Sequence, residues 1–313
     1  MSFRFCVLAA PFNQPKSCPT AKWNRTATTF INTGLYGSPP NSIFATTSNT
    51  IYVTIEASNK ILVTDADSAD PMIVQGREGW AITSVFVSNN SEIYIDSLDG
   101  KIVKWMPSTN NFVDVVDFKT DCFYLFIDIN NYLYCSSTHH LVTKIRLDHE
   151  MKTIDVAGTG KTGSAPDEFN HSKGIFVDTN LDLYVADSVN HRIQQFSLGN
   201  KTGKTVAGES SSDITIELCF PSSILLDADK YLFIADTENH RIVASSPNGF
   251  RCLVGCGERG KESYQLNGPL TFSFDVHGNM FVCDVGNERI QKFNWQKDFC
   301  SKYRIVQREN SFR

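Results

Sequence analysis

The second half of the sequence repeats at a nearly constant period, and this repeat restricts the fold more than any other feature does. The motif Ala-Asp-x-x-Asn-His-Arg-Ile occurs at residues 186–193 and again at 235–242. A variant with Cys283 and Glu288 in place of Ala and His occurs at 283–290. The Asp of the motif therefore recurs after 49 and then 48 residues, and a fixed period of this length indicates a repeat architecture.

Fainter copies of the same unit precede these three. Each unit begins with an apolar strand-like run, continues with two more, and ends with a weaker fourth run that finishes in Gly. Four short strands in each unit are typical of a propeller blade, which buries both faces of its sheet only by stacking on its neighbours. Equivalent positions of the first run are Ile43, Val85, Leu125, Ile175, Ile224 and Phe272, which makes six units.

The sixth unit lacks a fourth run, and the N-terminal part of the chain supplies a candidate for it. Residues 26–34 resemble the fourth run at 151–158, and no other run of that unit precedes them. We therefore predict an all-β, six-bladed β-propeller that is closed by its N-terminal strand, which also covers an open sheet edge. The expected boundaries are an N-terminal segment at 1–22, the propeller at 23–296 and a C-terminal tail at 297–313.

Composition and charge exclude several classes of protein. The chain is 41% hydrophobic and 12% aromatic, which is typical of a globular domain, and no apolar run of 18 residues indicates a membrane span. The net charge of −5 argues against a nucleic-acid partner. The apolar stretch within residues 1–10 is short for a secretory signal. It is either a remnant of a targeting signal or an irregular segment, and we favour the second.

The nine cysteines suggest disulfides, although an odd number leaves at least one unpaired. Cys18 precedes the closing strand and Cys300 follows the last strand of the same blade, so a bond between them would clasp the ring. Cys252 and Cys256 lie in one predicted strand, where their Cα atoms would be about 13 Å apart, too far to pair. Cys219 is the predicted partner for one of those two. Two further cysteines are expected to be buried thiols, namely Cys135 and Cys283.

The repeated Asn-His pair, Asn190-His191 and Asn239-His240, makes the chain resemble NHL-repeat proteins. The resemblance covers about half of the chain, because Ile55, Ser97 and Ser137 replace the motif Asp in the first three units. It implies a six-bladed ring that binds partners and in many members does no chemistry. Family members include extracellular receptors, an amidating lyase, and ubiquitin-ligase chains with RING, B-box and coiled-coil segments that this sequence lacks.

The residues shared by the repeats are expected to be structural rather than catalytic. A side chain that recurs in each unit usually does the same job in each, so charge-assisted pairs and hydrogen bonds are the favoured interpretation. We expect the pair His139-His140 to lie in a loop. No nucleophile, phosphate loop or metal-binding cysteine pair stands out, and we predict no catalytic residue, metal or cofactor. The structural motif residues are Asp187, His191, Arg192, Asp236, His240, Arg241, Asp284 and Arg289.

These observations favour a non-enzymatic scaffold that binds a protein, peptide or glycan on one rim, although the question of catalysis stays open. The loops between units are the expected rim, at residues 159–170, 209–218 and 258–267, with Trp80 and Tyr264 as candidate binding residues. One alternative is a metal-dependent enzyme of lyase or lactonase type, but the inner strands begin with weak metal ligands such as Ser42 and Ser84. Another is a substrate adaptor in ubiquitin transfer. The cysteines favour an extracellular or lumenal location over a cytoplasmic one, and the oligomeric state is left open.

Overall fold

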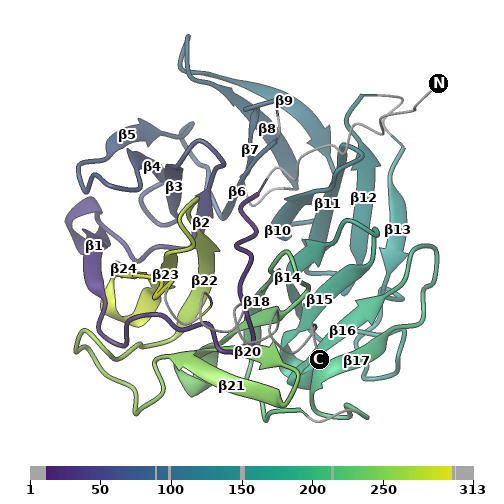
Figure 1. The fold of residues 1–313 in the computed structure, drawn as a ribbon. Helices are drawn as coiled ribbons and strands as arrows, with labels where there is room; N and C mark the ends of the chain where they lie inside the picture. The colour runs from purple at the N-terminus through teal and green to yellow at the C-terminus, as the bar shows by residue number, and fades with distance from the viewer. Residues whose placement is uncertain are drawn as a thin grey trace, which may run out of the picture.

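The protein folds as a ring of six sheets. The computed structural model describes residues 12–88, 90–97, 100–148, 152–212, 215–297 and 300. These residues form six antiparallel four-stranded sheets around a central axis, with only four short 3-10 helices (Figure 1). The fold is thus the all-β, six-bladed propeller that the repeat predicts.

The strands of blades 1 to 5 run outward from the axis in chain order. Blade 1 contains β2 (Ser42–Ala45), β3 (Thr50–Ile55), β4 (Lys60–Asp65) and β5 (Met72–Gln75), and blade 2 contains β6 (Ser84–Val87), β7 (Ile93–Asp96), β8 (Lys101–Met106) and β9 (Asn111–Asp117). Blade 3 contains β10 (Cys122–Ile127), β11 (Tyr132–Ser137), β12 (Val142–Arg146) and β13 (Ile154–Ala157). Blade 4 contains β14 (Ser172–Val177), β15 (Leu183–Asp187), β16 (Arg192–Phe196) and β17 (Lys204–Gly208), and blade 5 contains β18 (Pro221–Leu226), β19 (Leu232–Asp236), β20 (Arg241–Ser246) and β21 (Gly249–Val254).

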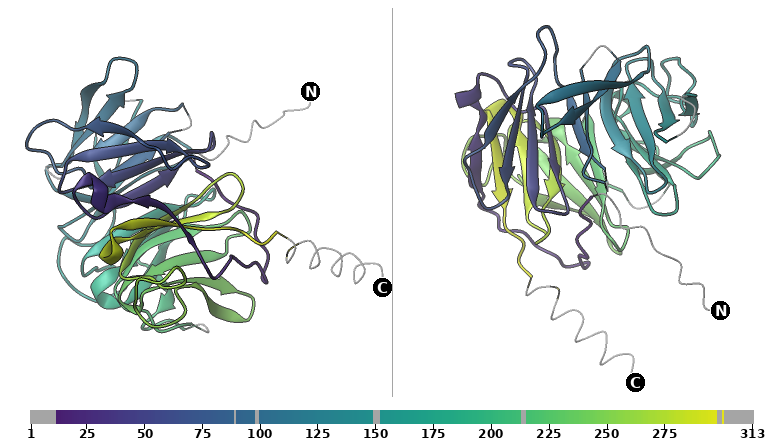
Figure 2. Two further views of the ribbon diagram at one scale, coloured as in Figure 1. Left: turned by 90° about the vertical axis from the view of Figure 1, so that its left-hand side faces the viewer. Right: turned by 90° about the horizontal axis from the view of Figure 1, so that it is seen from above.

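The sixth blade joins the two ends of the chain. Its inner strands are β22 (Pro269–Phe274), β23 (Met280–Asp284) and β24 (Arg289–Phe293), and its outer strand is β1 (Thr28–Asn32). β1 pairs antiparallel with β24, from Thr28 opposite Lys292 to Asn32 opposite Arg289. The N-terminal strand therefore closes the ring as predicted, with the purple β1 beside the yellow strands of blade 6 (Figure 2).

Aromatic side chains of the inner strands form much of the core. All residues of β2 and β6 are buried, because neighbouring blades cover both faces of each sheet. The rings of Phe44, Phe86, Phe126 and Phe176 come from four successive blades, and adjacent centroids are 4.6, 5.2 and 5.1 Å apart. Burial of each such side chain contributes about 1.5–3 kcal/mol, so these contacts stabilise the association of blades rather than any single blade.

The connections define two faces of the ring. Turns between first and second strands, and between third and fourth strands, lie on one side, which we call the turn face. The opposite side, the loop face, carries the connections between blades and the short helices η2 (Ser188–Asn190), η3 (Thr237–Asn239) and η4 (Val285–Asn287). The remaining helix, η1 (Thr33–Tyr36), follows β1. No helix in the described part of the chain is long and apolar enough to cross a bilayer.

Candidate functional site

The repeated Asp, Asn and Arg side chains form the same hydrogen-bonded cluster in three blades. Asp187 is fully buried, and its Oδ2 accepts hydrogen bonds from Arg192 Nε at 2.7 Å and Asn190 Nδ2 at 2.8 Å. Its Oδ1 accepts one from the backbone N–H of Asn170 at 2.8 Å. Arg192 also donates to the carbonyl oxygens of Ala165 and Glu168. The cluster fastens the loop that enters blade 4 to that blade.

The same contacts recur in blades 5 and 6. They are formed around Asp236 with Asn239 and Arg241, and around Asp284 with Asn287 and Arg289.

The histidines of the motif connect one blade to the next. His191 and His240 follow η2 and η3 with left-handed backbones, at φ of 52° and 54°. The Nδ1 atom of His191 accepts the N–H of Phe220 at 3.1 Å, and that of His240 accepts the N–H of Gly268 at 3.0 Å. Each donor belongs to the loop that enters the following blade. In this geometry both imidazoles act as hydrogen-bond acceptors between blades.

A third histidine, which the sequence reasoning placed in a loop, occupies the same position in blade 3. His140 has a φ of 57°, and its Nδ1 accepts the N–H of His171 at 3.2 Å. Its Nε2 lies 2.9 Å from Thr162 Oγ1. Burial and the neighbouring His171 lower the pKa of His140, which favours the neutral ring that this acceptor role requires. The missing Asp and Arg of the motif hid this equivalence in the sequence.

The chain's own N-terminal segment fills the central channel. Phe12 is buried against the rings of Phe126 and Phe176, with centroids 5.1 and 5.0 Å away. Asn13 Nδ2 donates to the carbonyl oxygens of Ala45, Thr46 and Phe274, which belong to blades 1 and 6, at 3.2, 2.8 and 2.9 Å. Figure 1 shows this purple segment crossing the centre of the ring. A pocket of about 60 Å³ lies between this segment and the inner strands.

Further contacts anchor this segment on the turn face. Gln14 Nε2 donates to the carbonyl oxygen of Leu226 at 3.1 Å, and the carbonyl oxygen of Pro15 accepts the N–H of Ala228 at 3.3 Å. Ser17 Oγ donates to Asp227 Oδ2. Residues 12–17, which we call the plug, are part of the expected N-terminal segment at 1–22 and pack against the inner strands and turns of the ring. The predicted tail at 297–313 lies outside the described residues apart from Lys297 and Cys300.

The channel is also crossed deeper inside. Tyr124, from the inner strand of blade 3, donates its hydroxyl hydrogen bond to the carbonyl oxygen of Leu270 in blade 6 at 3.3 Å. Burial raises the pKa of this tyrosine well above its usual value, so the hydroxyl stays protonated as a donor. Among the described residues, no three His, Cys, Asp or Glu side chains come together in a group that could hold a metal ion.

The described residues form three disulfides. Cys18 and Cys300 form the clasp between the two chain ends, with Cα atoms 5.5 Å apart. Cys252 and Cys256 also pair, with Cα atoms 5.7 Å apart, which contradicts the prediction from an extended strand. The strand ends at Val254, and Gly255 then reverses the chain with a φ of +69°. The expected pairing of Cys219 is accordingly wrong, because Cys219 is a free thiol.

The two cysteines that were expected to be buried thiols differ from each other. Cys135 is bonded to Cys122, so the prediction for Cys135 is wrong. Cys122 begins the inner strand of blade 3 and lies opposite Ser137, which is two residues beyond Cys135 in the neighbouring strand. The Cα atoms of Cys122 and Cys135 are 5.4 Å apart. Cys283 is a free, fully buried thiol, and burial raises its pKa to about 12. It is therefore unreactive at neutral pH.

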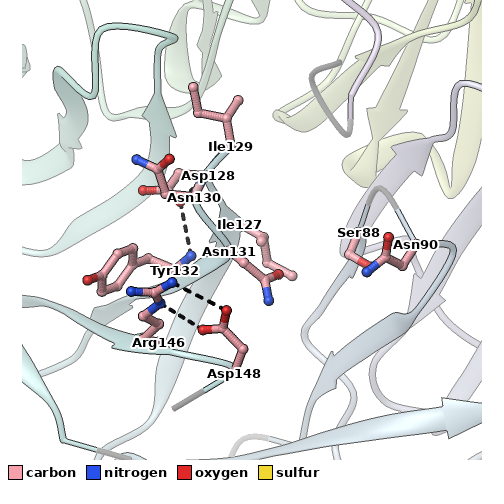
Figure 3. Close-up of a pocket in the computed structure, with 10 residues that line it drawn as sticks. All are labelled: Ser88, Asn90, Ile127, Asp128, Ile129, Asn130, Asn131, Tyr132, Arg146 and Asp148. Carbon is pink, nitrogen blue, oxygen red and sulfur yellow. Dashed lines mark hydrogen bonds and ion pairs between the residues drawn. The ribbon is translucent and has the colours of Figure 1, made fainter. Parts of the chain in front are cut away.

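An open cleft on the turn face separates blade 2 from blade 3. This polar cleft has a volume of about 570 Å³. Figure 3 shows Ser88 and Asn90 of blade 2 on one side and the turn after β10, with Arg146 and Asp148, on the other. The ion pair between Arg146 Nε and Asp148 Oδ1 is 2.7 Å long and holds the guanidinium at the edge of the cleft.

Part of this lining is satisfied by the protein itself and part is not. Asp128 Oδ1 accepts the N–H groups of Asn130 and Tyr132, and its Oδ2 accepts the hydroxyl of Tyr134 at 2.9 Å. By contrast, the side-chain amides of Asn90, Asn130 and Asn131 form no hydrogen bond with the described part of the chain. Each amide offers two donors and one acceptor, so the cleft presents unused hydrogen-bonding groups from two blades.

The residues predicted to bind on the rim lie elsewhere. Trp80 packs against Phe112 at a centroid distance of 5.3 Å, with the guanidinium of Arg77 4.9 Å from its ring. Tyr264 is 54% exposed on the loop face. Part of the predicted rim at 209–218 borders a cleft of about 340 Å³ with His191. The structure does not bring Trp80 and Tyr264 together, and neither lines the polar cleft.

Comparison with known proteins agrees with this architecture. Residues 169–196 match the family model of the NHL repeat, and no curated protein matches the chain. Similar solved structures include an auxiliary nutrient-binding protein from Bacteroides thetaiotaomicron, with a TM-score of 0.66 and 14% identity over 92% of this chain and 76% of that one. Another is a gluconolactonase from Xanthomonas campestris, with a TM-score of 0.67 and 9% identity over 92% of this chain and 100% of that one. A third is virginiamycin B lyase from Staphylococcus aureus, with a TM-score of 0.60 and 12% identity over 82% of this chain and 95% of that one.

Identity at this level shows the fold alone, and that fold carries both binding proteins and enzymes. The chain is a six-bladed β-propeller, and its residues 169–196 match the NHL repeat.

Proposed function

We propose that this protein is a non-enzymatic recognition scaffold that binds the polar chain of a peptide or glycan in the polar cleft between blades 2 and 3. The observation that carries the proposal is the contrast between the central channel and the polar cleft. The channel is filled by Phe12 and Asn13, whereas the cleft is open and presents unpaired amides from both blades. Paired amide donors and acceptors suit peptide backbones and sugar hydroxyls.

The test is a screen of immobilised glycans and peptides against the full chain, followed by a double variant, Asn90→Ala with Asn130→Ala. We expect the ligands found with the native protein to bind the variant at least tenfold more weakly, because hydrogen-bonding groups are lost on both sides of the cleft. The control is Asn248→Ala, which removes an exposed amide from the turn face of blade 5. Ligands that bind the double variant and the native protein equally well would place recognition elsewhere.

We also propose an extracellular or lumenal location. Three disulfides support it, because such bonds persist mainly in oxidising compartments. The check is the intact mass of the protein from its native source with and without reductant. A gain of two hydrogens per disulfide on reduction supports the proposal, and an unchanged mass with all thiols free contradicts it.

A further inference from the structure

Another cleft lies on the other side of blade 3, between the outer strands of that blade and the turns of blade 4. This apolar cleft has a volume of about 290 Å³, at the lower end of the range for small-molecule pockets. Its lining shares no residue with that of the polar cleft. Its main lining residues are Lys144, Ile154, Leu181, Leu183, Phe196 and Leu198.

Aliphatic side chains are exposed around this cleft. Ile154 is 45% exposed and Leu198 is 61% exposed. Leu181 sits in the turn between the first two strands of blade 4 with a φ of 66°, in the left-handed region. The corresponding turn positions in the other blades are Asn49, Ser91, Asn131, Lys230 and Gly278. Blade 4 alone among the six places a bulky apolar residue in this conformation. The side chain of Leu181 is half-buried, packs against the core with one part and lines the apolar cleft with another.

The only lining cation that is partly buried lacks a carboxylate partner. Lys144 Nζ lies 4.4 Å from the ring centroid of Tyr132 and 3.4 Å from the Tyr134 hydroxyl, and it forms no ion pair with a described residue. In blade 2 the equivalent lysine, Lys104, is 2.8 Å from Glu92 Oε1. Strand register places Tyr132 of blade 3 where blade 2 has Glu92, so the carboxylate is missing.

The electrostatic surroundings of Lys144 favour an added anion. Burial lowers the pKa of Lys144, which shows that its charged form is poorly solvated. The nearby carboxylate of Asp128 is occupied by the Tyr134 hydroxyl and two backbone N–H groups. Asp155 also lines the cleft, and its Oδ1 accepts the Thr143 hydroxyl at 2.7 Å. Lys201 adds a second cation at the rim, so the lining carries a net positive charge.

We propose that the apolar cleft binds a small aliphatic monocarboxylate, with the carboxylate on Lys144 and the hydrocarbon chain over Ile154, Leu181 and Leu198. The ligand's carboxylate supplies the counterion that Glu92 supplies in blade 2. Its chain covers the exposed aliphatic surface, and each methylene that is buried improves affinity roughly fourfold.

The experiment is isothermal titration calorimetry of the full-length protein with butanoate, hexanoate and octanoate. The controls are 1-octanol and octylammonium, which have the same hydrocarbon chain as octanoate but no negative charge. We expect affinity to rise roughly fourfold per methylene, and octylammonium not to bind. Binding of octanol or octylammonium as tight as that of octanoate, or no octanoate binding at millimolar concentration, would overturn the proposal.

Two variants test the residues. Lys144→Gln should weaken octanoate binding at least tenfold and leave octanol binding unchanged, while Lys104→Gln, the matched change in blade 2, should leave both unchanged. Leu181→Asn gives blade 4 the residue that blade 3 has at the equivalent turn position, Asn131. This variant should fold and bind octanoate several-fold more weakly, so it tests the site even where Lys144→Gln is unstable. Octanoate affinity that is unaffected by Lys144→Gln and Leu181→Asn contradicts the assignment.

Discussion

At the scale of single residues, the buried Asp187–Arg192 pair is the contact whose loss should cost most. Side-chain exposure is 0% for Asp187 and 6% for Arg192. Asp187→Ala leaves the guanidinium buried without its carboxylate, so we expect the free energy of unfolding to fall by about 3–5 kcal/mol. Urea unfolding followed by circular dichroism measures this loss.

The matched control for that substitution is an exposed ion pair. Asp114 is 67% exposed and pairs with Arg77 at 3.1 Å, so Asp114→Ala should change stability by about 0–1 kcal/mol. If both substitutions had the same small effect, the motif cluster would not be an important part of the stability of blade 4.

At the scale of elements, the plug contributes to the closure of the ring. Asn13 joins the inner strands of blades 1 and 6, and Phe12 fills space between blades 3 and 4. The double variant Phe12→Ala with Asn13→Ala should lower the free energy of unfolding by about 3 kcal/mol or more, because a buried ring and three hydrogen bonds are lost. Faster hydrogen exchange of the inner strands, measured by mass spectrometry, should accompany the loss.

A substitution on the same N-terminal part of the chain controls for this result. Leu35 is 78% exposed in η1, and Leu35→Ala should leave both stability and exchange unchanged. Native stability and native exchange in the Phe12/Asn13 double variant would show that the plug rests on the ring without supporting it.

At the scale of the whole molecule, the Cys18–Cys300 disulfide spans 282 residues and restricts the unfolded chain strongly. A loop of this length corresponds to about 6 kcal/mol in the chain-entropy model. We expect Cys18→Ala with Cys300→Ala to lower the free energy of unfolding by about 2–5 kcal/mol in chemical denaturation. The ring should still form, because β1 remains paired with β24.

The short disulfide offers the comparison within the same chain. Cys252 and Cys256 enclose only a four-residue separation, so in the chain-entropy model their double Ala variant should cost up to about 4 kcal/mol less than the clasp variant. An equal loss for the two double variants would show that local packing, and not chain entropy, dominates the effect of the clasp.

Much of the architecture could be predicted because the repeat encodes local structure. The alternation of apolar runs and turns sets the strands, and one blade needs neighbours on both faces, so six units imply a ring. The closing strand could be predicted because the sixth unit lacks a fourth run, whereas residues 26–34 resemble a fourth run that has no unit of its own. The Asp, Asn and Arg of the motif lie within six residues of one another, so their cluster depends mostly on local geometry.

Features that join distant parts of the chain were decided only by the tertiary structure. Phe12 and Asn13 carry no pattern that places them in the channel, since their partners belong to four different blades. The Cys252–Cys256 bond depends on one glycine reversing the chain, which strand periodicity does not reveal. Both clefts form between blades, where side-chain size and charge differ from unit to unit. The sequence by itself determined the blades and their number, because these follow from a local repeat. What the ring encloses and exposes depends on which side chains meet across blades.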